Sequence, residues 1–341
     1  MIRKEKNCIL TTVSGRRGWI ARSALALAGV SVGLWAQVSF AASYPEKPIK
    51  IVVPFPPGGG SDVVARIVGA RLAERLGQPV VVENLAGASS MLGAGRVANS
   101  QADGYTLLMA TNTTLSTNPA LQPRMPYDAA TSFAPISQVI RTPLILIANP
   151  KSEVTSVPEL IKLAGQRAGG MSYASFGAAS TGNIGGELFK RATRTEMVHV
   201  PYRGSAPAIA DLVAGHVPIL FDTGATALAQ IKAGRARALA VLQPKRSPLA
   251  PDVPAMSEFG FPNIDITVWF GLLAPAGTPR PIVQRLSQEI AEIVREPATH
   301  EKLLGQNVEA VGSSPSEFAE FLKADRGAMA QIIKDAAITI D

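Results

Sequence analysis

The stretch "IKIVVPFPPGGGSD", residues 49–62, determines the fold that we expect for this chain. Its first five residues are apolar apart from one lysine, a pattern typical of a buried strand. A loop rich in proline and glycine follows, and apolar residues then recur at helical spacing from 63 to 76. "PVVVEN" at 79–84 is a second strand-like run. The sequence therefore predicts a βαβ unit, which implies a parallel sheet with a right-handed crossover.

The loop of this unit has the composition of an anion-binding turn. Its prolines stiffen the backbone, and Gly58, Gly59 and Gly60 carry no side chain that would shield the amide groups. Ser61 or Asp62 is expected to cap the helix, whose first amides have no partner inside it. Two interpretations stay open: a neutral cup of amide donors for a carboxylate or a phosphate, or a tight turn that needs glycine only for its geometry.

Strand-like and helix-like segments alternate along the rest of the chain, which predicts the α/β fold class. With 341 residues, the chain exceeds the size at which one core usually stops growing, so we expect two domains. A first series includes a helix near 93–99 and ends with the strand 105–111. A second series begins with the strand 144–148 and is expected to contain strands at 171–175, 197–202, 217–222 and 236–242, helices near 158–164, 182–194, 206–213 and 227–233, a strand within 267–279, and helices near 281–295 and 315–334.

The first 41 residues have the composition of an export signal. Basic residues come first, an apolar stretch covers 24–36, and the small residues of "SFA" at 39–41 suit a signal peptidase. We predict a signal peptide over residues 1–41, cleaved after about Ala41, because the apolar stretch is shorter than the ~20 residues that span a bilayer. Arg16 and Arg17 also permit a twin-arginine signal, so the export route stays open.

Charge and cysteine content exclude several classes of function. Residues 1–41 carry six basic and one acidic side chain, so their removal lowers the net charge from +7 to +2. The remaining basic residues are scattered, which argues against a nucleic-acid partner. The single cysteine, Cys8, lies in the segment expected to be removed, so the mature chain has no thiol for a disulfide, a nucleophile or a metal ligand. We expect no cofactor and no metal.

The motifs of common enzyme classes are incomplete. No lysine follows the glycines as a phosphate-binding P-loop requires, and Val63 stands where a dinucleotide fingerprint has its third glycine. His199, His216 and His300 lack the spacing of metal ligands. "YASFG" places Tyr173 where a hydrolase elbow has glycine. We therefore expect a protein that is not an enzyme, with a secreted enzyme of the same fold class as the alternative.

Turns rich in Gly, Ser and Thr follow five of the predicted strands. The carboxyl ends of parallel strands share one edge of a sheet, so such turns are expected to face a common cleft. Their amides and hydroxyls suit a small polar anion. The five turns are residues 54–62, 111–118, 175–183, 201–207 and 222–226.

Several segments, in consistent order from about Tyr44 to the C-terminus, resemble the Bug family, the periplasmic receptors of tripartite tricarboxylate transporters. The resemblance implies a type II periplasmic binding protein: two α/β lobes with mainly parallel central sheets joined by crossover strands. It places lobe I at 42–145 and 266–341 and lobe II at 146–265. The segments that carry it are "YPEKPIKIVVPFPPGGGSDVVARIV", "VVVEN", "ADGYTLL", "VPYRGSAPAIADLVAGHV", "GRARALAV" and "VWFGLLAPAGTP".

In that family, a ligand carboxylate is held by the first strand-to-helix loop of one lobe and by turns of the other, partly through ordered waters. For Tyr202 and Asp222, inter-strand packing and helix capping are the alternatives to ligand binding. Transferred to this sequence, the implied ligand-binding residues are Phe55, Pro57, Gly58, Gly59, Ser61, Asp62, Asn84, Ser89, Thr111, Asn112, Ser175, Ser180, Thr181, Tyr202 and Asp222.

The resemblance implies a periplasmic, monomeric solute-binding protein that closes over a small carboxylate and delivers it to a membrane permease. A sensor receptor that signals to a kinase is the alternative. Two departures from the family pattern leave the identity of the carboxylate open. Residues 85–90 read "LAGASS" where the family has Arg-Pro-Gly-Ala-Gly-Gly, and Asn183-Ile184 stands where a His-Leu pair is expected.

Overall fold

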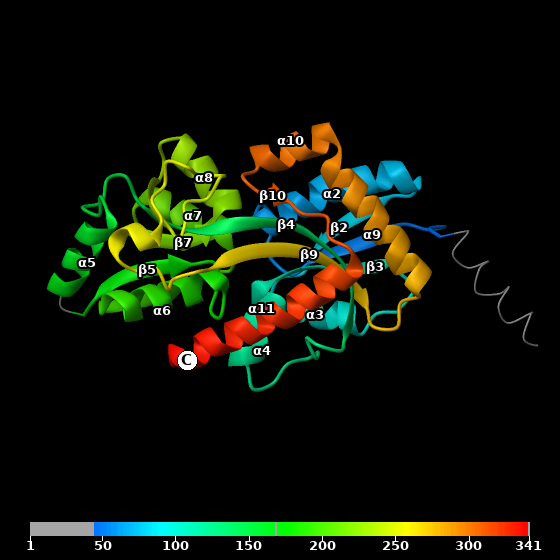
Figure 1. Cartoon of the computed structure of the whole chain (residues 1–341), viewed down its shortest axis with the longest axis horizontal. Helices are drawn as coiled ribbons and strands as arrows, with labels where there is room; N and C mark the ends of the chain where they lie inside the picture. Colours follow the sequence, from blue (N-terminus) through cyan, green and yellow to red (C-terminus); the bar gives the residue numbers. More distant parts are fainter. Residues whose placement is uncertain (1–43, 168, 340–341) are drawn as a thin grey trace, which may run out of the picture. The chain divides into compact units, whose positions relative to one another are not determined.

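The βαβ unit expected from residues 49–84 is present in the structure, a computed structural model that describes residues 44–167 and 169–339 (Figure 1). Strand β1 (Ile49–Val53) is buried on both faces and pairs in parallel with β2 (Val80–Asn84). Helix α2 (Gly60–Leu76) joins the two strands and ends at Gly77, which adopts a left-handed conformation with φ of 66°. The predicted signal peptide lies outside the described residues.

The strands form two sheet regions that share one long strand. In the first region, β2, β1 and β3 (Thr106–Thr111) are parallel, and β9 (Thr267–Pro275) pairs antiparallel with β3. In the second region, β5 (Met171–Ser175) pairs in parallel with β6 (Met197–Pro201) and β7 (Ile219–Thr223). These regions are the central sheets of two α/β lobes, each with three parallel strands.

Strand β4 (Phe133–Ala148) belongs to both sheets. Residues 133–143 pair with β9 and with the short β10 (Glu309–Ala310), whereas residues 144–148 pair with β7 and β8 (Arg237–Val241). The sequence prediction of a strand at 144–148 was therefore too short. Two prolines and two shifts of register interrupt the apolar pattern of the first part, which obscures it in the sequence.

Helices cover both sheets, and most of their predicted positions are confirmed within one to three residues. The prediction missed α10, the short α4, the 3₁₀-helix η2 and the π-helix η1, which follows β3 directly. The remaining elements are η1 (Thr113–Thr117), α3 (Met91–Ala98), α4 (Asn118–Leu121), α5 (Val157–Gln166), α6 (Thr181–Thr193), α7 (Ser205–Ala214), α8 (Gly224–Lys232), the 3₁₀-helix η2 (Met256–Phe259), α9 (Arg280–Arg295), α10 (Pro297–Gly305) and α11 (Pro315–Asp335).

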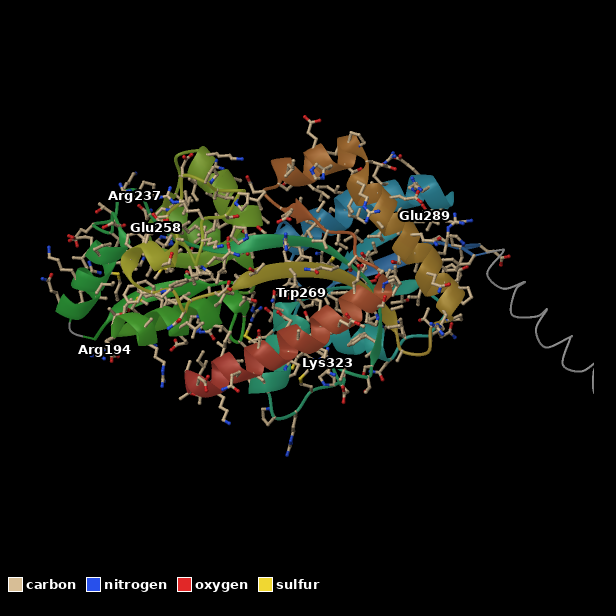
Figure 2. All side chains as sticks on the ribbon, in the orientation of Figure 1. Arg194, Arg237, Glu258, Trp269, Glu289 and Lys323 are labelled. Carbon is tan, nitrogen blue, oxygen red and sulfur yellow. The ribbon has the colours of Figure 1, made fainter. Side chains whose placement is uncertain are left out.

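The first lobe is organised around Trp269 of β9 (Figure 2). This side chain is fully buried and meets the rings of Phe318 and Phe321 of α11 edge-on, with centroids 5.6 and 5.8 Å away. Gly271 lets α11 approach the sheet, since a Cβ atom there would lie 2.2 Å from Phe318 Cζ. The last turn of α11 reaches the second lobe, where Arg191 Nη1 donates to the carbonyl of Ala336 at 2.9 Å.

On the other side of the first sheet, ion pairs join α2 to α9. Arg75 of α2 pairs with three glutamates of the α9 region. One of them, Glu289 (labelled in Figure 2), also accepts from Arg285. The hydrogen bonds to Glu289 and Glu296 raise the pKa of the Arg75 guanidinium.

None of the described helices combines the length and apolarity needed to cross a bilayer. The two lobes have separate layers of helices but share β4, and the residue after α11 contacts the second lobe.

Candidate functional site

The turns that follow five parallel strands meet at one cleft. The turns after β1 and β3 form its first-lobe wall, and the turns after β5, β6 and β7 form its second-lobe wall. Strand β9 supplies two further apolar residues. The lining residues are Phe55, Pro56, Gly59, Gly60, Ser61, Thr111, Thr113, Phe176, Thr181, Gly204, Ser205, Ala206, Thr223, Val268 and Phe270.

Four helices begin at this cleft. Helix α2 begins at Gly60, α6 at Thr181 and α7 at Ser205, and Thr223 is the N-cap of α8. Each helix start presents amide groups without intrahelical partners and the positive end of a helix dipole. The residues that line the cleft include no charged side chain. The cleft therefore attracts an anion through backbone dipoles and hydroxyls instead of through a counter-ion.

The first loop provides the amide groups expected from its sequence, with one correction. The amide of Val63 is the first in α2 to find a helical acceptor, the carbonyl of Gly59 at 3.1 Å. Across the described part of the chain, no acceptor is recorded for the amides of residues 59–62. The amide of Gly58 is occupied, because it donates to Asp62 Oδ2 at 3.0 Å. The available cup thus comprises residues 59–62 and excludes Gly58.

The prediction that Ser61 or Asp62 caps α2 was wrong. The helix begins earlier than expected, with Gly59 instead of Ser61 or Asp62 as its N-cap and no side-chain capping bond. The buried Asp62 lies in the first turn and reaches back to the loop. Its carboxylate also accepts from Arg66 Nε at 3.1 Å and from Asn84 Nδ2 at 3.0 Å. Burial would raise the pKa of Asp62, but these hydrogen bonds together hold it below its ordinary value.

The predicted site residues divide into those that line a hollow and those that lie behind it. Phe55, Gly59, Ser61, Thr111 and Thr181 line the main cleft. Two others, Ser89 and Tyr202, line a neighbouring hollow, and Gly58 lines a third. Pro57 lines none of them. The residues behind the cleft are Asp62, Asn84, Asn112, Ser175, Ser180 and Asp222.

The residues behind the cleft fix the turns that line it. Ser180 caps α6 by accepting from the amide of Asn183 at 3.1 Å. Asp222 is fully buried and accepts from Ser205 Oγ and Thr226 Oγ1, both at 2.6 Å. Burial raises the pKa of Asp222. The Asp222 carboxylate thereby orients the first turns of α7 and α8, while its own atoms stay away from the cleft.

Ser175 and His199 form a pair that the sequence did not predict. Ser175 Oγ lies 2.7 Å from His199 Nε2, and Asn183 Nδ2 lies 3.2 Å from His199 Nδ1. Because the Asn183 amide can only donate through Nδ2, Nδ1 of the ring must accept, and the ring proton sits on Nε2. The ring therefore donates to Ser175 and cannot act as its base. Ser175 is fully buried and its hydroxyl donates to Gly177 O, so this pair supports the turn and is not a nucleophile.

The sequence prediction missed several lining residues, above all Thr113. This residue belongs to the π-helix η1, is 1% exposed, and lines the cleft. Its buried hydroxyl has no hydrogen-bond partner among the described residues. A buried hydroxyl without a partner is costly, which indicates that a bound ligand or water completes its bonding. The run of Thr and Ser after β3 was the available signal, but the sequence did not show which members face the cleft.

Within the described residues, no group of three or more His, Cys, Asp or Glu side chains is placed to hold a metal ion. The three histidines lie apart from one another in the fold: His199 on β6, His216 after α7 and His300 on α10. His216 Nδ1 lies 3.2 Å from Asp211 Oδ1 at the surface. The residues that line the cleft carry amides, hydroxyls and apolar groups, which suit an organic anion.

Comparison with known proteins relates the chain to solute receptors. The family described as tripartite tricarboxylate transporter family receptor matches residues 64–338. The protein BugT of Bordetella pertussis is 36% identical over 315 residues, which cover 91% of this chain and 96% of BugT.

Two solved structures share the fold. The structure of R. palustris Rpa4515 with adipate has a TM-score of 0.84 and 36% sequence identity, and covers 87% of this chain and 99% of that chain. MatC (Rpa3494) from Rhodopseudomonas palustris with bound malate has a TM-score of 0.81 and 28% identity, with 85% and 100% covered. Together with the structure of the periplasmic binding protein BugD, these similarities confirm the predicted two-lobed fold.

The partnerless hydroxyls of Thr113 and Thr117 offer a matched pair of substitutions. Both are buried in η1, but only Thr113 lines the cleft. We expect Thr113→Val to weaken ligand binding about tenfold or more, since a hydrogen bond to a charged carboxylate contributes about 1.5–3 kcal/mol. Thr117→Val should leave the affinity unchanged. Calorimetric titration with a bound carboxylate measures both, and equal affinities in the two variants would show that Thr113 does not meet the ligand.

The His199 ring predicts a pH dependence of stability. Burial lowers the pKa of His199 from 6.5 to about 4. Above pH 6.5 the ring is neutral in the folded and unfolded states, so its contribution is complete. As the pH falls from 6.5 to about 4, only the unfolded chain binds the proton, and the free energy of unfolding decreases. His199→Gln keeps a donor and an acceptor without this titration.

We therefore expect the stability difference between wild type and His199→Gln to shrink as the pH falls through this window. Urea unfolding of both proteins at several pH values between 7 and about 4 measures that difference. Carboxylates that titrate in the same range change the free energy of unfolding of both proteins equally, so their contributions cancel in the difference. A difference that stays constant with pH would mean that the folded protein does not depress the pKa of this ring.

Proposed function

This chain belongs to the family of tripartite tricarboxylate transporter receptors, and from that membership we propose that it captures a small carboxylate in the described cleft and delivers it to a membrane permease of that transporter class. Receptors of this family bind solutes and are not enzymes. The observation that carries the proposal is the convergence of four helix starts on a cleft without a charged side chain. Adipate and malate, found in two similar structures, are both carboxylates.

The carboxylate is held mainly by the amides of residues 59–62 at the start of α2. These donors replace part of the hydration shell that the anion loses on entering the cleft. The first turns of α6 and α7 approach from the second lobe, and the hydroxyl of Thr113 adds one donor. The rings of Phe55, Phe176 and Phe270 surround the apolar part of the ligand. Small-molecule sites usually combine a few polar groups in this way with walls that are mostly apolar.

Ligand binding works as a clamp between two lobes, with lobe I at 42–145 and 266–341 and lobe II at 146–265. The proposed boundaries lie close to the point where β4 changes partners from β9 to β7. A contact across the rim of the cleft supports a closed arrangement, because Ser89 Oγ donates to the carbonyl of Ala178 at 2.7 Å. A ligand shifts the population toward this closed state only if it binds that state more tightly than the open one.

The proposal includes the cellular setting of the receptor. The protein is exported to the periplasm, its signal peptide is removed after about Ala41, and it acts as a monomer. The periplasmic location is that of the matched receptors. The closed form, in which the two lobes meet at Ser89 and Ala178, presents the surface that the permease recognises.

A panel of organic acids tests the function directly. We expect at least one mono-, di- or tricarboxylate to raise the melting temperature, because a ligand at ~100 Kd stabilises the native state by about 2.7 kcal/mol. Gly59→Val should abolish this shift by filling the cup with a branched side chain. The backbone tolerates the change, since Gly59 has a φ of −80° and a Cβ atom there would lie 3.8 Å from its closest neighbour, Pro56 O.

Gly165→Val, which lies far from the cleft where a Cβ atom meets nothing within 4 Å, is the matched control. Circular dichroism should show wild-type helical content in both variants. If no acid in a broad panel shifts the wild type, the carboxylate function is wrong. If acids shift Gly59→Val as much as wild type, the carboxylate is bound elsewhere than at the amide cup.

The rim hydrogen bond gives a second prediction. Ser89 has a φ of 49°, a left-handed conformation that is strained for a residue with a Cβ atom. Ser89→Ala removes the hydroxyl and keeps the strain, whereas Ser89→Gly removes both. We expect both variants to bind the ligand about fivefold more weakly, because the closed state loses one hydrogen bond. Ser89→Gly should resist urea better than Ser89→Ala by roughly 1 kcal/mol, because only glycine relieves the backbone strain.

Ser100→Ala is the control, since Ser100 Oγ also donates to a backbone carbonyl, that of Arg96, but within one lobe. Its affinity for the ligand should equal that of wild type. Small-angle scattering with ligand should show less compaction in Ser89→Ala than in wild type. Unchanged affinity and compaction in Ser89→Ala would mean that this contact does not favour closure.

A further inference from the structure

A second hollow adjoins the main cleft and has a different chemical character. Its empty volume is about 1060 Å³. Phe55, Pro56 and Phe176 line both this hollow and the main cleft, so the two spaces adjoin at these side chains. The turns after β2, β5 and β6 complete it. Among the residues that line it, Arg203 is the only charged one.

Arg203 is an exposed guanidinium without an acidic partner. Across residues 44–167 and 169–339, no hydrogen bond or ion pair of its side chain is recorded, whereas most other arginines of the chain pair with an acid or a carbonyl. Arg203 precedes Gly204, whose backbone lines the main cleft. A close approach fixes this turn: Gly204 has a φ of 124°, and a Cβ atom there would lie 3.0 Å from Pro56 Cδ. The guanidinium is therefore attached one residue away from the amide-lined site.

The turn that carries Arg203 is held by its neighbour Tyr202. The Tyr202 hydroxyl donates to Asp211 Oδ2 at 2.7 Å, which fixes the start of the turn against α7. Burial and the Asp211 carboxylate raise the pKa of Tyr202 to about 12, so the hydroxyl keeps its proton. Asp211 does not line the hollow and is engaged by Tyr202 and His216, which leaves the guanidinium of Arg203 free to meet an anion.

We propose that Arg203 is the specificity-determining residue for a second, distal carboxylate of the ligand. The proposal rests on the proposed function: one carboxylate occupies the amide cup, the hydrocarbon chain passes the rings of Phe55 and Phe176, and the other carboxylate enters the second hollow. Guanidinium and carboxylate form two parallel hydrogen bonds, which an uncharged end group cannot match. The receptor therefore selects α,ω-dicarboxylates over monocarboxylates of equal length.

Paired ligands that differ only in the distal group test this inference. Calorimetric titrations compare succinate, glutarate and adipate with their respective monoamides. For the dicarboxylate of best-fitting length, we expect wild type to prefer the diacid about tenfold over the monoamide. Arg203→Gln should reduce this preference to less than about twofold, and Arg203→Lys should retain part of it. Added salt should lower the preference of wild type, because the guanidinium is exposed.

Arg124→Gln is the matched control, because Arg124 is also exposed and lines none of the hollows. It should keep the full preference for the diacid. Equal binding of diacid and monoamide by wild type, or an undiminished preference in Arg203→Gln, would overturn the role of Arg203 while leaving carboxylate capture intact. Failure of every diacid and monoamide to bind wild type would instead count against the proposed function itself. Melting temperatures without ligand establish that each variant is folded.

Discussion

Unpaired amide groups at the start of a helix are the constraint on which the functional architecture depends. Four helices begin at the same cleft, and only α6 has a side-chain cap, which Ser180 supplies. Helix α2 has no side-chain cap, and α7 and α8 also lack one. Those amides need an acceptor, and an anionic ligand supplies it without a buried positive side chain.

The acidic residues near the cleft serve this arrangement from behind. Asp62 shapes the loop before α2, and Asp222 orients the starts of α7 and α8. A third carboxylate, Asp325 of α11, accepts from Ser116 Oγ of η1 and from Trp269 Nε1 at 3.0 Å. Burial raises the pKa of Asp325. It joins the turn that carries Thr111 and Thr113 to β9 and α11, so the polar wall of the cleft is anchored in the core of the first lobe.

The sequence was sufficient for the features that depend on neighbours along the chain. The apolar run of β1, the helical spacing of α2 and the glycine at its end are local, and they predicted the first βαβ unit. The sequence could not distinguish Thr113, which lines the cleft, from Asn112. Asn112 donates to the carbonyl of Thr267, a partner more than 150 residues away. Ser175 likewise meets His199 only in the folded chain. Arg203 was visible in the turn "PYRGSAP", but its lack of an acidic partner is a property of the tertiary structure.

Strand β4 has a consequence beyond ligand binding. Its sixteen residues are hydrogen-bonded partly in one sheet and partly in the other, and the chain crosses between the lobes again at β9. Neither sheet is complete without this shared backbone, so removing one lobe would leave the other with open strand edges. The two lobes are therefore expected to unfold together as one cooperative unit.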